Sequence, residues 1–541
     1  MARQLLSGRL KRDLYLRLAK QRLLALAPRA EELLEPTSRR ELFVYLGYAH
    51  DLLGERKAAA QWFARALTVP GSSRWMRKLA LHGTLRTVRQ VPFLDRAAPP
   101  PKPGYWRDHI VALVNRGFIT ARRPWSLVPS QTLDPAARQE SFETFWQAIA
   151  RVYPFFKHKG IDWIAVRTRY RERLRGVKDA GGFYDLMRRL VRELRDAHCW
   201  LSNYGKRPRL PRWSPGLRVR KIQGQAIVTR VLPRSPAARR GIVPGTRILT
   251  VDGLAVPKRI AAIRPLLWVH SSERAFQETA HKMLLNGPPG SAVTLTIQLP
   301  GRSGARSITL RRWRRIFWDT LPPAFPVTRT SRIHYGRHPS GYGYIRFLKF
   351  YGQKKLKQEF EQALAALRST PGLIIDLRDN PGGFGHYMAH MVGRLMSRPA
   401  PVCYSRRWVG GPPGRLVSRP LRFRPHGAWQ YTGPVALVTN TATGSASDLF
   451  ACYLTSARRV ITVGTPTHGN LPGHSMWVVL PYGLVTRISS GYVVRPNGTP
   501  IEGNGTVPQI RAERTRDDVI QGTDSVLDRA VDALKKAQGT P

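Results

Sequence analysis

A serine that follows an apolar run is the residue of this sequence best suited to nucleophilic chemistry. The run PVALVTN, residues 434–440, is typical of a buried strand, and the small residues of GSASD, 444–448, allow a helix to begin directly after it. This spacing predicts Ser445 at the start of that helix. The unpaired N–H groups and positive dipole end of a helix stabilise a developing anion there, as acyl transfer requires. An N-cap hydroxyl is the alternative role, because small-residue turns with serine are common.

A tight turn after a second buried strand offers backbone donors for the same anion. The run GLIIDL, residues 372–377, is apolar enough for a strand covered on both faces, and Asn380-Pro381-Gly382-Gly383 follows it. Such a turn leaves backbone N–H groups free to point outward. A plain glycine-rich turn is the alternative.

A histidine and a glutamate far from Ser445 are suited to proton transfer. His198 follows a helical stripe of apolar residues between 183 and 194, and Glu502 stands in the glycine-rich segment 501–505. An imidazole with an unperturbed pKa of about 6.5 can deprotonate a hydroxyl at neutral pH, and a carboxylate can orient it. Composition alone favours a capping or core role for His198, and a solvated turn position is the alternative for Glu502.

Charge sets this chain apart from an average globular protein. Its 541 residues include 89 Lys and Arg against 34 Asp and Glu, a net charge of +55, and 42% of them are hydrophobic, as expected for several globular domains. The charge predicts long-range, salt-sensitive attraction to anionic surfaces and acidic segments. No zinc knuckle, helix-turn-helix or RNA-recognition signature accompanies it, so we expect no specific binding to nucleic acid.

Cysteine usage and hydropathy bear on cofactors and compartment. Cys199, Cys403 and Cys452 are too few for a disulfide framework and lack metal-ligand spacing, so we expect free core thiols, no metal and no cofactor. No apolar stretch is long enough to cross a bilayer, and the N-terminus has no apolar signal-peptide core, so we expect no membrane span; the compartment stays unassigned, with the cytoplasm as the default. The Arg-rich, amphipathic residues 1–29 suit a first helix or an organelle presequence.

Changes of pattern divide the chain into five segments. Within the N-terminal helical segment, residues 41–70 place small and large residues as a tetratricopeptide hairpin does, and an ordinary amphipathic helix pair is the alternative. The expected segments are a helical, tetratricopeptide-like region (1–97), a linker (98–140), a helical part of the core (141–205), a β domain (206–315) and an α/β core with a C-terminal helix (316–541).

The β segment looks like a PDZ domain. The motifs that carry this likeness are Ser235-Pro236-Ala237, Gly241-Ile242, Pro244-Gly245 and Val251-Asp252-Gly253, with a last strand at 292–298. PDZ domains take up an extended peptide as an added strand and bind its C-terminal carboxylate with backbone N–H groups. The resemblance makes Gly216, Leu217, Arg218 and Val219 the candidate peptide-binding loop.

Together, the PDZ-like block, IIDLRDNPGG and TGSASD resemble the C-terminal-processing (tail-specific) serine proteases and their relatives around the tricorn core protease. The likeness implies a multidomain α/β (α+β) fold, with an N-terminal helical region, a PDZ-like β domain and an α/β protease core of the crotonase-like or ClpP-like type. In that family the first serine of the small-residue signature is the nucleophile, which implies Ser445. The oxyanion hole would be formed by Gly382 or Gly383 together with Ala446.

The resemblance also implies a catalytic branch. Bacterial processing proteases use a Ser/Lys dyad, but Asn470 occupies the lysine position here and cannot serve as a base. Tricorn-like relatives take a histidine from an L-x-D-x-H segment and an acid from an E-G-x-G segment, which implies His198 and Glu502. His468 is a rival base at a position where the family varies. The supporting residues expected are Asp376, Arg378 and Asn380 for the turn, and Ser447 and Asp448 as caps of the helix.

The implied function is a serine endopeptidase that cleaves extended or C-terminal polypeptide segments by Ser-His-Glu acyl-enzyme catalysis, after docking on the PDZ-like domain. The basic surface favours acidic polypeptides. The alternative is a catalytically inactive scaffold that binds peptides, because Asn470, Thr246 and Gln509 depart from the family pattern. Neither interpretation specifies the oligomeric state.

Overall fold

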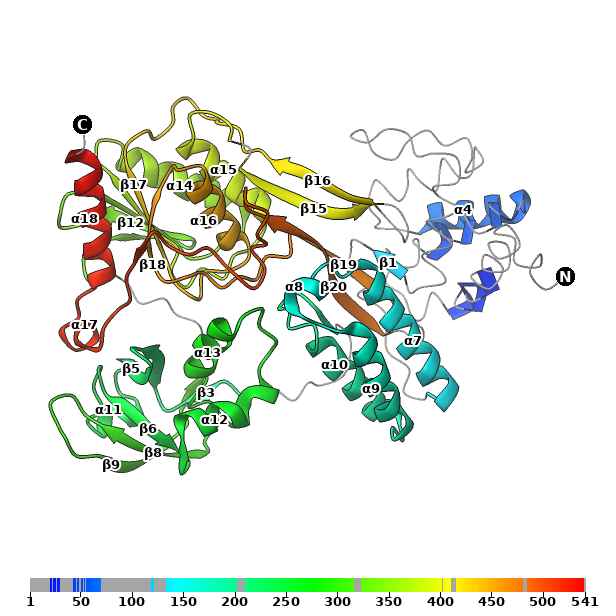
Figure 1. The fold of residues 1–541 in the computed structure, drawn as a ribbon, viewed down its shortest axis with the longest axis horizontal. Coiled ribbons are helices and arrows are strands. Elements are labelled where there is room, and N and C mark those ends of the chain that lie inside the picture. The colour runs from blue at the N-terminus through cyan, green and yellow to red at the C-terminus, as the bar shows by residue number, and fades with distance from the viewer. Residues whose placement is uncertain are drawn as a thin grey trace.

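Helices, two large sheets and a separate β domain make up the part of the chain that the structure describes (Figure 1). In this computed structural model the described residues are 118–120, 133–201, 210–315, 323–400, 402–409, 415–479 and 484–539, together with parts of the segment 20–69. Most of the expected helical region 1–97 and most of the expected linker 98–140 lie outside the described residues.

Helix α4 (Arg56–Thr68) represents the N-terminal region. It buries Ala59, Phe63 and Ala66. A β-carbon added to Gly47 would lie 2.6 Å from the ring of Phe63, so these two positions are in close contact. This contact accounts for the glycine at position 47, and the tetratricopeptide repeat itself stays a prediction.

Three amphipathic helices form one layer of the molecule. They are α7 (Pro135–Val152), α9 (Trp163–Arg175) and α10 (Ala180–Arg192). Each begins after an aspartate whose carboxylate accepts a backbone N–H of the first turn, namely Asp134, Asp162 and Asp179. Helix α7 starts before the expected boundary at residue 141, because Asp134 caps it and Pro135 suits the first helical position.

One long strand, β20 (Val485–Val494), joins this helical layer to the rest of the molecule. Ile488 packs among the helices, whereas Val493 packs into the core of the α/β unit. Strand β20 pairs with β19 (His474–Val479), with β15 (Cys403–Val409) and with the short β2 (Trp200–Leu201). Because β2 follows directly after His198, this histidine is fixed to residues far along the chain.

A mainly parallel sheet forms the centre of the α/β unit. Its strands, in spatial order, are β11 (Thr328–Arg329), β12 (Ile333–Arg337), β13 (Gly343–Phe347), β14 (Leu373–Asp376), β17 (Val435–Thr439), β18 (Ile461–Gly464) and β21 (Ile510–Arg511). Strands β13, β14, β17, β18 and β21 run parallel. The carboxyl ends of β14 and β17 therefore lie side by side, which brings the turn after β14 next to the turn after β17.

Helices cover both faces of this sheet. The core that contains Ile375 also holds residues of α14 (Gln353–Ala366), α15 (Gly385–Leu395) and α16 (Ala446–Ser456). The neighbouring Ile374 packs instead with residues of α18 (Ser525–Gly539). The predicted burial of these strands on both faces is confirmed.

The β domain is a sheet with the order β4-β5-β6-β8-β9, in which α13 (Glu273–Lys282) packs against the edge strand β4. The strands are β4 (Leu217–Ile222), β5 (Gln225–Val231), β6 (Arg247–Val251), β8 (Ala292–Gln298) and β9 (Arg306–Arg311). Two expectations need correction. Strand β9 follows the strand expected to be last, and Leu217, Arg218 and Val219 belong to β4 rather than to a loop. Gly216 alone keeps a turn conformation, with φ +94°.

The three cysteines are free and buried, as expected, and the sulfur atoms of Cys403 and Cys452 lie 3.6 Å apart. Among the helices of the described segments, none combines the length and apolar content that a membrane crossing needs.

Candidate active site

Ser445 stands at a strained turn between β17 and α16. Its backbone has φ 55° and ψ −117°, a conformation that residues other than glycine rarely adopt. Two acceptors hold it there, because the Ser445 N–H donates to Asp448 Oδ2 at 2.8 Å and to Asn470 Oδ1 at 2.6 Å. Helix α16 begins at the next residue, so its free N–H groups are directed toward the serine.

The turn after β14 lies directly against this serine. A β-carbon added to Gly382 would lie 2.7 Å from Ser445 Cβ, and the N–H of Gly444 donates to the carbonyl of Asn380 at 3.0 Å. The side chain of Asn380 also shapes the turn, since its Oδ1 accepts the N–H of Gly382 at 2.9 Å and its Nδ2 donates to the carbonyl of Phe347. The expected role of Asn380 in holding the turn is confirmed.

The three backbone N–H groups that were expected to bind an anion, those of Gly382, Gly383 and Ala446, differ in whether they already have an acceptor. The N–H of Gly382 is already bonded to Asn380. For the N–H groups of Gly383 and Ala446 no acceptor occurs among the described residues. Gly383 and Ala446 are therefore the two backbone donors that remain available beside Ser445.

Buried charges anchor the strand that precedes this turn. Asp376 accepts bonds from the guanidinium of Arg378 and from the phenol of Tyr344. Burial alone would raise the pKa of Asp376, but Arg378 and Arg346 hold it below its usual range. The sequence-based expectation that Asp376 and Arg378 hold the turn is confirmed.

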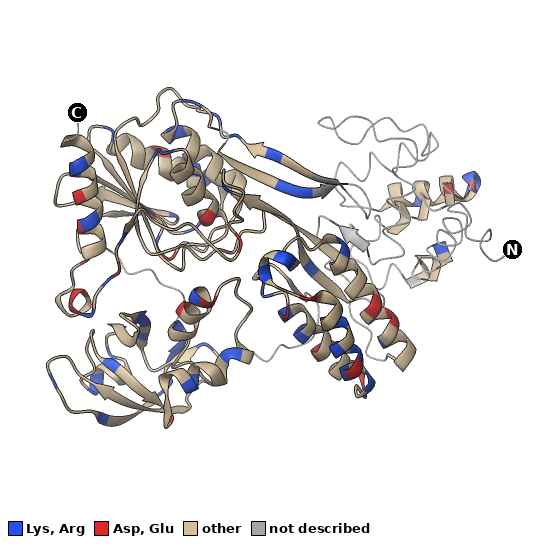
Figure 2. Ribbon diagram, viewed as in Figure 1, with Lys and Arg blue, Asp and Glu red and all other residues tan. Residues whose placement is uncertain are grey.

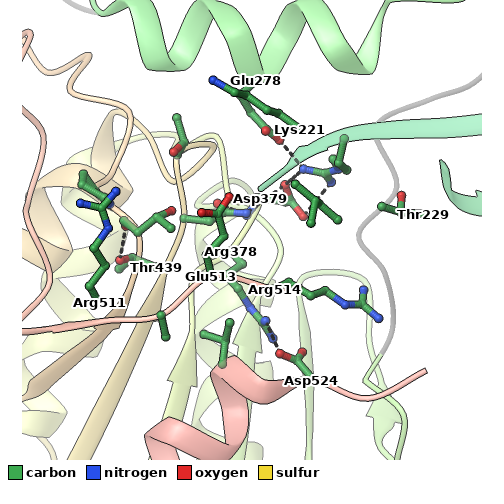
Figure 3. A pocket seen from close by; sticks show the side chains of 18 of the residues that line it. Lys221, Thr229, Glu278, Arg378, Asp379, Thr439, Arg511, Glu513, Arg514 and Asp524 are labelled. Atoms are coloured by element: carbon green, nitrogen blue, oxygen red, sulfur yellow. Dashed lines mark hydrogen bonds and ion pairs between the residues drawn. The ribbon is translucent and has the colours of Figure 1, made fainter. Parts of the chain in front are cut away.

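Asp379, one residue before Asn380, connects the turn to the β domain (Figure 3). Arg220 of strand β4 binds both of its carboxylate oxygens, at 2.8 and 3.0 Å, and Lys282 of α13 adds a contact at 3.2 Å. Burial would raise the pKa of Asp379, but Arg220 and Lys282 hold it well below the usual value. A cavity of about 470 Å³ lies beside this network and is lined by both the β domain and the α/β unit.

His198 lies in the loop between α10 and β2. Its backbone N–H donates to Asp196 Oδ1 at 2.8 Å, and its ring Nδ1 is buried without a partner among the described residues. Burial lowers the pKa of His198 to about 4, although Asp196 opposes the shift while Arg487 and Lys159 add to it. The imidazole is therefore neutral at neutral pH, which is the state that a general base requires.

Glu502 is fully buried in the loop before β21. Its Oε1 accepts from Lys159 Nζ at 2.8 Å, and its backbone carbonyl contacts His158 Nε2 at 2.9 Å. Burial and the nearby Asp196 raise the pKa of Glu502 to about 8, and Lys159 opposes that shift. The second oxygen, Oε2, is buried and has no partner among the described residues.

The loop of residues 468–470 links Glu502 to the serine. Asn470 binds the Ser445 N–H, and the carbonyl of Gly469 accepts from Gly503 at 2.7 Å. His468, the rival base, lies 3.4 Å from His270 between ring nitrogens, and burial lowers its pKa well below the usual value. His198 lies near enough to contribute to this shift.

The structure brings the serine, the turn and the 468–470 loop into direct contact. It shows no hydrogen bond between Ser445 Oγ and His198, or between His198 and Glu502, within the described segments. Nor does any group of three or more His, Cys, Asp or Glu side chains in the described residues have an arrangement that could hold a metal ion.

Three supporting roles differ from the expectation or were not part of it. Ser447 does not cap α16 with its side chain, because its hydroxyl is buried without a partner in the described structure. Asp448 does more than cap, since it accepts N–H groups from Ser445, Gly469 and Asn470. The ion pair between Lys159 and Glu502 had no sequence signal, because 343 residues separate its members.

Comparison with known families gives two matches. The profile of peptidase family S41 matches residues 341–512, and that of the tricorn protease C1 domain matches residues 134–192. Both matched segments contribute to the site, since the first contains Ser445, the turn and Glu502, and the second contains Lys159.

Individual proteins agree with this result. The chain is 24% identical over 302 residues to a carboxy-terminal-processing protease of Bartonella bacilliformis, covering 54% of this chain and 59% of that protein. It is 27% identical over 389 residues to tricorn protease homolog 2 of Streptomyces coelicolor, covering 69% of this chain and 30% of that protein. The chain thus spans less than two thirds of the length of either relative.

Among solved structures, mature CPAF is similar with a TM-score of 0.59 and 19% identity, covering 74% of this chain and 99% of that one. At this identity the likeness shows a shared fold.

Proposed function

We propose that this chain, which carries S41 peptidase and tricorn C1 domains and is related to the C-terminal-processing proteases, is a serine peptidase with Ser445 as its nucleophile. The observation that carries the proposal is the strained Ser445 at the start of α16, next to the turn that contains Gly382, with the N–H groups of Gly383 and Ala446 left without an acceptor in the described residues. Two such donors stabilise the oxyanion of a tetrahedral intermediate, and losing one typically slows catalysis by about 10²–10³.

His198 is the general base of this proposal and Glu502 is the acid that orients it. A buried, neutral imidazole can accept the proton of Ser445 Oγ. His198 Nδ1 and Glu502 Oε2 each have an unused bonding position, which suits the bond that an imidazolium makes to a carboxylate. Catalytic hydrogen bonds are often long or absent before substrate binds and form in the reacting complex.

The reaction then follows acyl-transfer chemistry. Ser445 Oγ attacks the carbonyl carbon of the scissile peptide bond while its proton passes to His198. The oxyanion lies between the N–H groups of Gly383 and Ala446. The imidazolium returns the proton to the leaving amine as the C–N bond breaks, and water, deprotonated in the same way, releases the acyl group from Ser445.

Substrate docking is assigned to the β domain. Among the described strands β4 pairs only with β5, and helix α13 packs beside it, so an extended peptide can add along the other edge of β4 as in a PDZ domain. Gly216 provides the turn that precedes this strand, and Leu217, Arg218 and Val219 provide its first backbone groups. The basic side chains of β4 favour acidic segments.

Fluorophosphonate labelling tests the proposal. Wild-type protein should form one adduct, which peptide mass spectrometry places on Ser445, and Ser445→Ala should form none. Ser447→Ala is the matched control on the same helix, because the Ser447 hydroxyl has no partner among the described residues. His198→Ala and Glu502→Gln should slow labelling strongly. A scaffold that only binds peptides would give no adduct in the wild type and would retain peptide affinity in Ser445→Ala.

A further inference from the structure

Helix α8 (Phe156–Lys159) lies between the two loops that carry His198 and Glu502. Lys159 Nζ donates to Glu502 Oε1 at 2.8 Å and to the carbonyl of Arg195 at 2.7 Å. Its side chain is only 7% exposed and that of Glu502 is fully buried. One ammonium group therefore contacts the acid and the backbone three residues before the base.

Further bonds strengthen the same connection. The guanidinium of Arg195 donates back to the carbonyl of Lys159, and His158 Nε2 contacts the carbonyl of Glu502. On the opposite side, Ser271 Oγ accepts the N–H of Ala197 at 3.1 Å, and Ser271 lowers the pKa of Glu502. The direct bonds between the acid and the base segment thus run through Lys159, and Ser271 lies close to both.

The charges around Glu502 explain why a cation is needed. Asp196, whose side chain is completely buried, is close enough to repel the carboxylate of Glu502. The other ionisable groups that face the cluster are His158 of α8, His198, the thiol of Cys199, the guanidinium of Arg487 and the phenol of Tyr153. Burial and repulsion by Asp196 both favour the protonated form of Glu502, and the ammonium group of Lys159 opposes them.

We infer that Lys159 is a positioning residue of the Ser-His-Glu site: its ammonium group favours the ionised form of Glu502 and fixes this residue to the backbone segment that carries His198. The inference rests on the proposed function, because it assigns Lys159 a role that acts through Glu502. A protonated Glu502 would lack the negative charge that stabilises the imidazolium of His198, so His198 would be a weaker base for the serine.

The test compares the pH dependence of fluorophosphonate labelling in five proteins: wild type, Lys159→Met, Lys159→Arg, Glu502→Gln and the double variant Lys159→Met/Glu502→Gln. At pH 7, Lys159→Met should label at least about tenfold more slowly than wild type, and its rate should recover as the pH rises. The acid limb of its pH profile, where the labelling rate falls toward low pH, should lie at least about one pH unit higher than in wild type. Lys159→Arg should keep most of the wild-type rate. In the Glu502→Gln background, Lys159→Met should change the rate less than about twofold, because the two residues act as one unit.

Controls separate this role from a structural one. Lys157→Met removes the same charge from an exposed position on the same helix and should label like wild type. A melting curve for each variant shows whether it is folded, and Lys159→Arg tests the role even if Lys159→Met unfolds. The inference would be overturned if Lys159→Met lowered the labelling rate without moving the acid limb of the pH profile. It would also be overturned if Lys159→Met lowered the rate as much in the Glu502→Gln background as it does in the wild type. Wild-type protein that is not labelled would overturn the proposed function and this inference together, whereas labelled Lys159→Met that behaves like Lys157→Met would overturn only the inference.

Discussion

Ser445 shows how neighbouring residues hold a single residue in a strained backbone conformation. A positive φ at serine costs on the order of 1–3 kcal/mol, and it persists because Asp448 and Asn470 both accept its N–H. The sequence predicted the strand, the tight turn and the helix start around this residue. It did not predict the use of Asn470, because that contact depends on a loop 25 residues away folding back onto the turn.

Replacement of His198 by Asn should flatten the acid side of the stability curve. In the folded chain the pKa of His198 is lowered from 6.5 to about 4, chiefly by burial. Below pH 6.5 the unfolded chain therefore binds a proton that the folded chain does not, and stability falls as the pH drops from 6.5 toward 4. Melting temperatures measured from pH 7.5 to 4.5 should fall more steeply for wild type than for His198→Asn. Parallel curves would contradict the buried, neutral state of this ring.

Gly382→Ala should abolish labelling of Ser445 and lower the melting temperature. Its new β-carbon would lie 2.4 Å from the carbonyl oxygen of Gly444 and 2.7 Å from Ser445 Cβ, in a backbone with φ +95°. The turn must shift to relieve these contacts, which separates the Gly383 donor from the serine. Gly304→Ala is the control, since an added β-carbon there meets nothing within 4 Å. Gly382→Ala labelled at the wild-type rate would contradict the close approach of the turn.

At the scale of elements, parallel strands explain why two distant motifs meet. The turns after β14 and β17 come together because these strands are hydrogen-bonded neighbours that run in the same direction. Apolar runs in the sequence predicted both strands, and the small residues predicted both turns. The pairing could be expected only from the family likeness, because apolar patterning gives a strand its buried faces but not its neighbour.

Two element boundaries differed from expectation for local reasons. Helix α7 starts before residue 141 because Asp134 caps it and Pro135 fits its first position. The residues expected as a carboxylate-binding loop lie in β4, since Leu217 and Val219 alternate inward with Arg218 between them, as a strand requires.

The ion pair between Arg220 and Asp379 connects strand β4 of the β domain to the turn after β14 in the α/β unit. Arg220→Met should therefore impair turnover. Without Arg220, Asp379 keeps Lys282 and Arg346 but loses its bidentate partner at the start of the oxyanion turn. We expect kcat to fall about tenfold with little change in KM for a short peptide that does not reach β4. Lys221→Met, an exposed neighbour on the same strand, is the control and should leave kcat unchanged. Equal kcat values for the two variants would show that this ion pair is only structural.

At the scale of the whole molecule, positive charge is distributed rather than confined to one surface. Lys and Arg occur on the helical layer, on the β domain and on the α/β unit (Figure 2). The net charge of +55 could be read from the composition. Where the charges lie relative to the candidate site could not, because some arginines, such as Arg346 and Arg394, are buried within the fold. Composition thus predicts association with anions and gives no information about where they bind.

Ionic strength should therefore act on substrate capture and not on chemistry. For a peptide rich in Asp and Glu, KM should rise several-fold between about 25 and 300 mM NaCl while kcat stays constant, because salt screens the long-range attraction. A neutral peptide of the same length should show a much smaller change. Initial rates at several substrate concentrations give both constants, and equal salt effects on the two peptides would contradict a preference for acidic segments.

The late position of β20 in the sequence has a consequence for the synthesis of the protein. Leu484 and Ile488 form part of the hydrophobic core of the helical layer, and the loop that contains Glu502 comes after them in the sequence. A nascent chain that has left the ribosome as far as residue 450 contains Ser445 and His198. It lacks Glu502 and the residues of β20 that complete the core of the helical layer. Under the proposed function, synthesis must be nearly finished before the three side chains can meet, so an unfinished copy would lack the complete site.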